Sequence, residues 1–124
     1  MGYLQFISQR RVSNQEMVTI LKEGVLGINK LCTENHFKGF KFAALYYDKE
    51  KRKIGIQPTN NPSRGTSNIL FIKQGTLAKI SAKSFLRYCG ITHGQSTAYP
   101  AIWNEREKLV EITLSEEDNN NVYK

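Results

Sequence analysis

The chain has 124 residues, of which 40% are hydrophobic and 23% charged, a composition typical of folded globular domains. This length accommodates one hydrophobic core, so we expect a single domain over residues 1–124. No apolar run approaches the roughly 18 residues that a membrane span needs, and no signal-peptide pattern is present, so we expect a cytoplasmic protein without a membrane partner. Two cysteines and two histidines are too few and too scattered for a disulfide framework or a metal site, and we expect no metal and no cofactor.

The formal net charge of +7 is unevenly distributed along the chain. Residues 1–103 carry 15 Lys and Arg against 5 Asp and Glu, whereas residues 104–124 carry 3 against 6. A basic body can neutralise the phosphates of a nucleic acid. The same charge can simply keep a small protein soluble, so the charge by itself leaves the function open.

The first half of the chain is expected to form strands around one short helix. Alternating apolar and β-prone residues predict an edge strand over Tyr3–Arg11, strands over Met17–Leu21 and Val25–Ile28, a helix over Lys30–Phe37, and strands over Phe40–Tyr47 and Lys53–Gln57. Asn29 can accept an unpaired backbone N–H, and Gly39 tolerates a left-handed conformation, so these residues should begin and end the helix. Pro58 cannot donate to a strand ladder and should stop the last strand.

The second half is expected to contain the same elements. Residues 59–68 are polar and rich in Pro and Gly, which predicts a connection. Beyond it we expect strands over Ile69–Ile72 and Thr76–Ile80, a helix over Ala82–Tyr88, and strands over Tyr99–Trp103 and Leu109–Leu114. Ser81 should cap this helix and Gly90 should end it. An acidic tail follows over residues 115–124.

Residues of the two halves match at several positions, which predicts an internal repeat. Repeat 1 covers about residues 17–58, and repeat 2 covers about residues 69–114. The turn residue Gly24 matches Gly75 at an offset of 51, and Tyr47 matches Trp103 at an offset of 56. Chance similarity between two basic, β-rich segments is the alternative, because the identities are few.

The order of elements in each half resembles the AbrB/MazE-like family of swapped-hairpin β-barrels. The resemblance rests on a Gly turn, a strand ending in Ile28 or Ile80, a short helix closed by Gly and a charged hairpin. The chain is also similar to uncharacterised prokaryotic or phage proteins with this doubled pattern. The resemblance implies a mainly β fold with short helices, in which two repeats interleave their hairpins into one pseudo-twofold barrel. It also implies DNA binding, and either a monomer with an internal pseudo-dimer or a homodimer.

The basic residues of the turns and helix starts are the candidate DNA contacts. In paired copies these segments can come together on one side of the barrel, where long cations reach phosphates and helix N-termini add N–H donors. A basic pair near the N-terminus can add further contacts. A solvated charged surface is the alternative for each position. The candidates are Arg10, Arg11, Lys22, Lys30, Lys73, Lys79, Lys83 and Arg87.

Aromatic residues could stack on bases where they are exposed, but their positions inside strands and helices favour core packing. We expect Tyr47 and Trp103 to be matched core anchors. The other aromatic residues with this expectation are Tyr46, Phe85, Tyr88 and Tyr99.

No catalytic pattern is visible. His36 and His93 have no carboxylate or nucleophile at a recognised spacing, and no glycine-rich phosphate-binding motif occurs. We therefore expect a non-catalytic DNA-binding protein of the transcription-regulator type, contacting duplex DNA. The alternative is a protein-interaction module, such as a phage-encoded inhibitor or antitoxin, that binds a protein partner through edge strands of the barrel and the tail.

Overall fold

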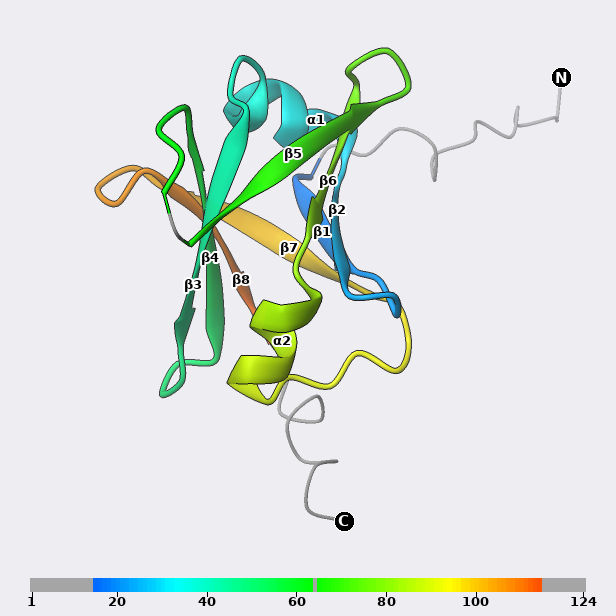
Figure 1. Ribbon diagram of the computed structural model, residues 1–124, viewed down its shortest axis with the longest axis vertical. Helices are drawn as coiled ribbons and strands as arrows, with labels where there is room; N and C mark the ends of the chain where they lie inside the picture. Colours follow the sequence, from blue (N-terminus) through cyan, green and yellow to red (C-terminus); the bar gives the residue numbers. More distant parts are fainter. Residues whose placement is uncertain (1–14, 64, 115–124) are drawn as a thin grey trace, which may run out of the picture.

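The computed structural model describes residues 15–63 and 65–114, which form a closed, antiparallel barrel of eight strands with two short helices (Figure 1). The expectation of a mainly β barrel with short helices is therefore confirmed. The strand expected over Tyr3–Arg11 and the acidic tail lie outside the described residues. No helix in the described part of the chain has the length and apolar character needed to cross a bilayer.

The helices and strands follow the order expected from the sequence. They are β1 (Met17–Ile20), β2 (Val25–Ile28), α1 (Lys30–Cys32), which continues as the π-helical turn η2 (Thr33–Phe37), β3 (Phe42–Asp48), β4 (Lys53–Thr59), β5 (Thr66–Ile72), β6 (Leu77–Ser81), α2 (Lys83–Cys89), β7 (Thr97–Asn104) and β8 (Leu109–Thr113).

The strands of the two halves alternate around the barrel in pairs. Their order is β1-β2-β6-β5-β3-β4-β8-β7, closing from β7 back to β1. Besides the four hairpins, β2 pairs with β6, β4 with β8, β1 with β7 and β3 with β5. Exchanging the first four strands for the last four leaves this pattern unchanged. The hairpins are thus interleaved, and each half depends on the other to complete its sheet.

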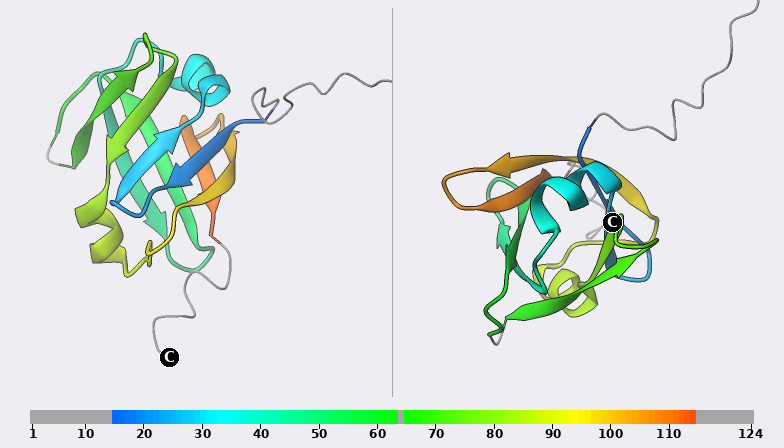
Figure 2. Two further views of the ribbon diagram at one scale, coloured as in Figure 1. Left: turned by 90° about the vertical axis from the view of Figure 1, so that its right-hand side faces the viewer. Right: turned by 90° about the horizontal axis from the view of Figure 1, so that it is seen from above.

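Side chains alternate between the barrel interior and solvent, as the period of a β-strand requires. Phe37 of η2 and Leu86 of α2 are fully buried and lie at opposite ends of the barrel, with α1 across the opening in the view from above (Figure 2). Burial of one such side chain contributes about 1.5–3 kcal/mol to stability. The strand residues that fill the interior include Val18, Ile20, Leu26, Ile28, Ile54, Ile56, Ile80, Val110 and Ile112.

Two of the differences between the expected and the observed strand ends concern the connection between the two halves. Pro58 does not stop β4 but lies within it, opposite Ala43 of β3. The pairing of β4 with β8 ends at Ile56, so the missing N–H of Pro58 falls where β4 has a strand neighbour on one side only. The connection expected over residues 59–68 is shorter, because Thr66 already begins β5 and pairs with β3.

The two helix starts differ from each other. Asn29 caps α1 as expected, since its Oδ1 accepts from the backbone N of Cys32 at 3.1 Å. The expected cap at Ser81 was wrong: Ser81 pairs with Val25 as the last residue of β6. Ala82 takes the cap position and forms no side-chain hydrogen bond there. Pairing with β2 therefore extends β6 past the residue that local chemistry favoured as a cap.

Candidate nucleic-acid interface

The turn between β1 and β2 lies directly against the start of α2. Gly24 in this turn has a φ of 87°, and its carbonyl accepts from the backbone N of Ala82 at 2.8 Å. A Cβ added to Gly24 would lie 2.8 Å from the Cβ of Lys83 and 2.9 Å from its Cα. Glycine is thus needed here both for the backbone conformation and for the close approach. The contact holds Lys22 beside α2.

The loop after α2 fastens the same turn from the other side. The backbone N of Lys22 donates to Ser96 Oγ at 3.1 Å, and the backbone carbonyl of Lys22 lies 3.2 Å from His93 Nδ1. A carbonyl can only accept, so Nδ1 must carry the proton. Lys22, Arg87, Ile91 and His93 line a shallow depression between the turn and the loop, together with Gly90, Thr92 and Gly94.

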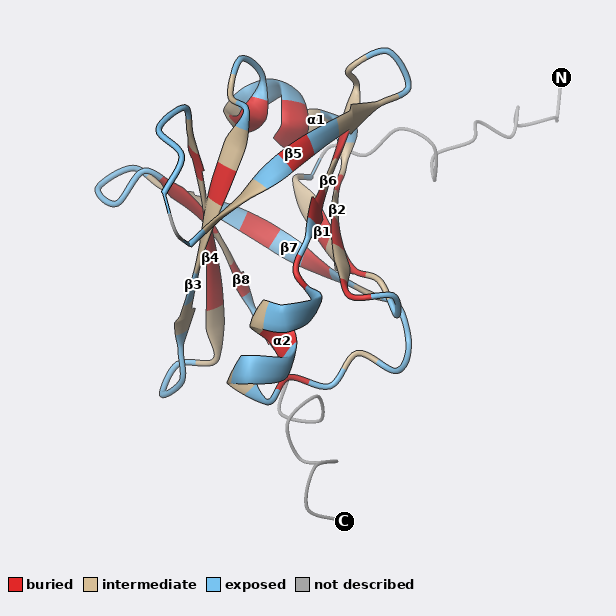
Figure 3. Cartoon of the chain, in the orientation of Figure 1, coloured by how far each residue is buried: buried red, intermediate tan, exposed pale blue. Residues whose placement is uncertain are grey.

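The outer side of α2 carries polar and aromatic side chains. Lys83, Ser84, Arg87 and Tyr88 are exposed, and their spacing places them on one side of the helix (Figure 3). Leu86 is buried, and Phe85 and Cys89 pack against the core. We call Lys22, Lys83, Arg87 and Tyr88 the α2 patch.

The core packing expected for Tyr88 was wrong, since 92% of this residue is exposed. The helical spacing places Phe85, Leu86 and Cys89 on the inward side of α2, so Tyr88 lies on the outer side. The expectation holds for Tyr99, which is buried, and Tyr47 and Trp103 pack against the core as partly buried anchors. Phe85 is partly buried and also packs against the core. Tyr46 does not meet the expectation, since half of its surface is exposed.

The remaining candidate DNA contacts lie elsewhere on the barrel. Lys30 begins α1 and Lys73 lies in the turn between β5 and β6; this helix and this turn lie at the end of the barrel opposite α2 (Figures 1 and 2). Lys79 is partly exposed on β6, between Gly27 of β2 and Leu70 of β5. The structure thus brings together Lys22, Lys83 and Arg87, and separates them from Lys30 and Lys73. Arg10 and Arg11 lie outside the described residues.

The segments that form β1, β2, β5, β6 and α2 carry an excess of basic residues. Residues 17–28 and 66–89, which form β1, β2, β5, β6 and α2, contain five Lys and Arg but only one acidic residue, Glu23. None of these five cations forms an ion pair with another described residue. The five are Lys22, Lys73, Lys79, Lys83 and Arg87.

The other two hairpins carry balanced charge. Residues 42–59 and 97–113 contain six Lys and Arg and five Asp and Glu. Here Lys53 lies 3.6 Å from Glu111, and Lys108 pairs with Glu105. The hydrogen bond from Lys108, with a further one from Trp103, lowers the pKa of Glu105. Part of the charge on these two hairpins is therefore paired, whereas none of the five cations above is in an ion pair with a described residue.

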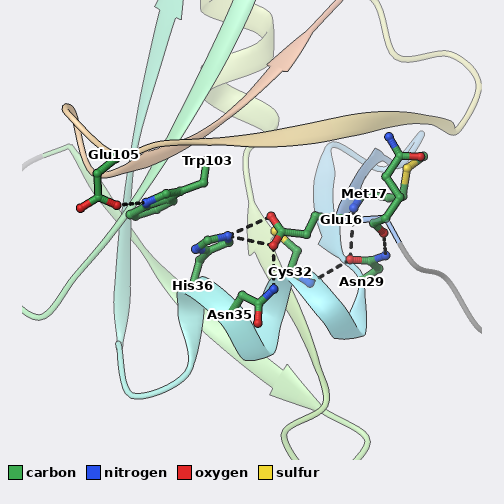
Figure 4. A network of polar contacts seen from close by, with 9 residues as sticks. Glu16, Met17, Asn29, Cys32, Asn35, His36, Trp103 and Glu105 are labelled. Carbon is green, nitrogen blue, oxygen red and sulfur yellow. Dashed lines mark hydrogen bonds and ion pairs between the residues drawn. The ribbon is translucent and has the colours of Figure 1, made fainter.

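A polar network sits at the α1 end of the barrel (Figure 4). His36 Nε2 lies 2.8 Å from Glu16 Oε1, and Asn35 donates to Glu16 Oε2 at 2.7 Å. The His36 ring stacks on Trp103 with a centroid distance of 4.3 Å and an interplanar angle of 7°. Trp103 Nε1 donates to Glu105 at 2.8 Å. No sequence spacing identifies Glu16 as the partner of His36, because the two meet only through the folding of η2 against the start of β1.

Cys32 lies beside this network but is a poor nucleophile. Burial, with a smaller contribution from the Glu16 charge, raises the pKa of its thiol to about 12. The reactive form of cysteine is the thiolate, which is scarce at neutral pH when the pKa is that high. In the described part of the chain, no three His, Cys, Asp or Glu side chains come together in a way that could hold a metal ion. The arrangement is suited to fixing η2 on the barrel.

Comparison with known proteins identifies no relative: no family model, curated protein or solved structure matches the chain significantly. The resemblance to the AbrB/MazE-like family and the internal repeat stay predictions.

Proposed function

We propose that the protein is a non-catalytic, cytoplasmic DNA-binding protein of the transcription-regulator type, which contacts the phosphates of duplex DNA through the α2 patch. The observation that carries this proposal is that Lys22, Lys83 and Arg87 lie together beside α2, exposed and free of ion pairs among the described residues. Glu23 is the one acidic residue within residues 17–28 and 66–89. Clustered, unneutralised cations are the electrostatic footprint of a protein that binds a polyanion.

The helix itself supports the proposal. Lys83 and Arg87 are four residues apart on α2, and a like-charged pair at this spacing destabilises a helix by about 0.2–0.5 kcal/mol. A phosphate between them removes the repulsion. Arg87 adds a planar fork of donors suited to phosphate oxygens, and all three cations are exposed, so contact needs little desolvation.

Salt dependence of binding tests the proposal. Fluorescence anisotropy with a labelled random duplex of about 20 base pairs should show affinity falling steeply with salt, with a logarithmic slope of roughly −0.9 per phosphate contacted. Lys22→Glu, Lys83→Glu and Arg87→Glu should each weaken binding and reduce the slope by about 1. Lys49→Glu, in the mixed-charge turn between β3 and β4, is the matched control with the same change in net charge.

Two results would overturn the proposal. One is the absence of binding at low salt and micromolar protein. The other is an equal loss of DNA affinity in Lys49→Glu and in the α2-patch variants. Net charge alone, and not the position of the cations, would then explain the binding.

A second candidate function, binding to a protein partner, is favoured by two exposed apolar side chains. Leu70 is 61% exposed on β5 and Ile102 is 66% exposed on β7. Each lies on a part of its strand that has only one paired strand: β5 pairs with β3 only over Thr66–Asn68, and β7 pairs with β1 only over Thr97–Pro100. Such local edges can accept an added strand. A stoichiometric protein partner recovered together with the chain, in the absence of DNA binding, would favour this candidate.

A further inference from the structure

The most exposed large hydrophobic residue of the described chain is Tyr88, with 92% of its surface in water. It stands on the outer side of α2, next to Arg87 and one turn beyond Ser84. An exposed aromatic ring on a rigid element has little to lose on binding, because only two side-chain torsions need to be fixed. Among the residues that the structure describes, no side chain covers the ring, and two cations, Lys83 and Arg87, lie on the same helix.

The helix at the other end of the barrel holds its ring differently. His36 of η2 turns inward, stacks on Trp103 at 4.3 Å and contacts Glu16 (Figure 4). Tyr88 of α2 has 92% of its surface exposed, so its ring is available to a ligand.

We propose that the α2 patch also binds single-stranded DNA, with an unpaired base stacked on the Tyr88 ring and the adjoining phosphates held by Arg87, Lys83 and Lys22. For its phosphate contacts this inference rests on the proposed function; the base contact is additional. Stacking needs a free base face, and in a duplex the base faces are already stacked on one another. An aromatic ring beside cations is the combination that single-strand-binding surfaces use, and it tolerates any base because every base has a π face.

Arg87 links Tyr88 to the shallow depression beside α2. Tyr88 does not line this depression, but Arg87, the next residue along the chain, does, together with Lys22, His93 and the buried Ile91. His93 Nδ1 is engaged by the carbonyl of Lys22, which holds this side of the depression in place. Charge alone would attract any polyanion, and the ring adds an interaction that depends on the base.

Three ligands of equal length separate these contributions: a single-stranded oligo(dT) of about 12 nucleotides, its abasic analogue with the same phosphates, and a duplex. The protein variants are Tyr88→Ala, Tyr88→Phe and, as a matched control, Tyr46→Ala. Tyr46 is also an exposed tyrosine, at 50%, but it lies on β3 outside the patch.

We expect Tyr88→Ala to weaken oligo(dT) binding about 5- to 100-fold, the effect of losing one stacked base. Tyr88→Phe keeps the ring and should bind within about twofold of the unchanged protein. Tyr46→Ala should bind as the unchanged protein does. The abasic strand should bind the unchanged protein and Tyr88→Ala equally, and duplex binding should be insensitive to Tyr88→Ala. An oligonucleotide carrying 5-iodouracil should crosslink to Tyr88.

The outcomes distinguish the two proposals. The proposed base contact is wrong if the unchanged protein binds oligo(dT) and the abasic strand with equal affinity, and if Tyr88→Ala binds oligo(dT) as tightly as the unchanged protein does. The phosphate-binding function would still stand in that case. If oligo(dT), abasic strand and duplex all fail to bind at low salt, both proposals fail. Since Tyr88 is almost fully exposed, its substitution should leave folding intact, which the unfolding midpoint of each variant checks.

Discussion

The two ends of the barrel are closed by helices in different ways. At the α1 end, side chains make the joint: Asn29 bonds the helix to β1, and His36 is held between Glu16 and Trp103. At the α2 end, the helix is joined to the barrel through its backbone: the Gly24 turn packs on Lys83, and the Gly24 carbonyl accepts from the backbone N of Ala82. The side chains of Ser96 and His93 bond to the backbone of Lys22 in the turn, and not to α2. The joint at α1 therefore engages side chains of the helix, whereas the joint at α2 leaves Arg87 and Tyr88 on the surface, where they can contact a ligand.

Substitution of two matched glycines should give the largest difference in stability between the two ends of the barrel. Gly24 and Gly75 have nearly the same φ, 87° and 86°, but a Cβ on Gly75 would meet no described atom within 4 Å. Gly75→Ala should therefore lower the free energy of unfolding by about 1 kcal/mol, the cost of the left-handed backbone alone. Gly24→Ala should lower it by about 3 kcal/mol, because Lys83 must also move. Urea unfolding measures both, and equal losses would mean that the turn does not rest on α2 in solution.

The helix caps give the next largest difference. Asn29 Oδ1 accepts from the backbone N of Met17 and of Cys32, each at 3.1 Å, and its Nδ2 donates to the carbonyl of Gln15 at 2.9 Å. Asn29→Ala should cost about 2 kcal/mol of stability. Ser81→Ala should change stability by less than about 0.5 kcal/mol, since Ser81 is exposed and caps nothing. A large effect of Ser81→Ala in thermal unfolding would show that α2 begins earlier than the structure has it.

The two cysteines give the smallest expected difference. In the unfolded chain the Cys32 thiol ionises near its usual pKa of 9.0, whereas in the fold burial raises the pKa to about 12. The neutral thiol therefore stabilises the fold fully below pH 9, and this contribution is lost as the pH rises from there toward 12. Between about pH 8 and about pH 9.5 the loss from this one thiol is roughly 0.8 kcal/mol.

Urea unfolding at these two pH values checks the prediction. Cys32→Ala should show a smaller drop in stability than the unchanged protein. Cys89→Ala is the control: burial raises the pKa of the partly exposed Cys89 thiol too, but that residue lies at the C-terminal end of α2 and is less enclosed. An equal drop in the free energy of unfolding in Cys32→Ala and in the unchanged protein would show that the Cys32 thiol does not cause the pH dependence.

Much of the fold could be predicted because the signals are local. Asn29 and Gly90 cap helices as side-chain and backbone chemistry requires, with Gly90 in the left-handed conformation at a φ of 74°. Runs of β-prone and apolar residues, separated by turn residues, predicted all eight described strands, because these signals lie within each segment. Among the site residues, the basic turn and helix positions Lys22, Lys83 and Arg87 were also visible in the sequence.

Local sequence patterns therefore specify the identity and order of the elements, and which residues carry charge. The strand ends and the surroundings of each helix side depend on contacts between distant parts of the chain. Pro58 stays in β4 because its open side has no neighbour, and Ser81 joins β6 because β2 pairs with it. Tyr88 is exposed and His36 enclosed because the barrel offers Trp103 and Glu16 to one helix, while the other already fills its inner side. These outcomes depend on residues distant in the chain, whose proximity no local pattern encodes.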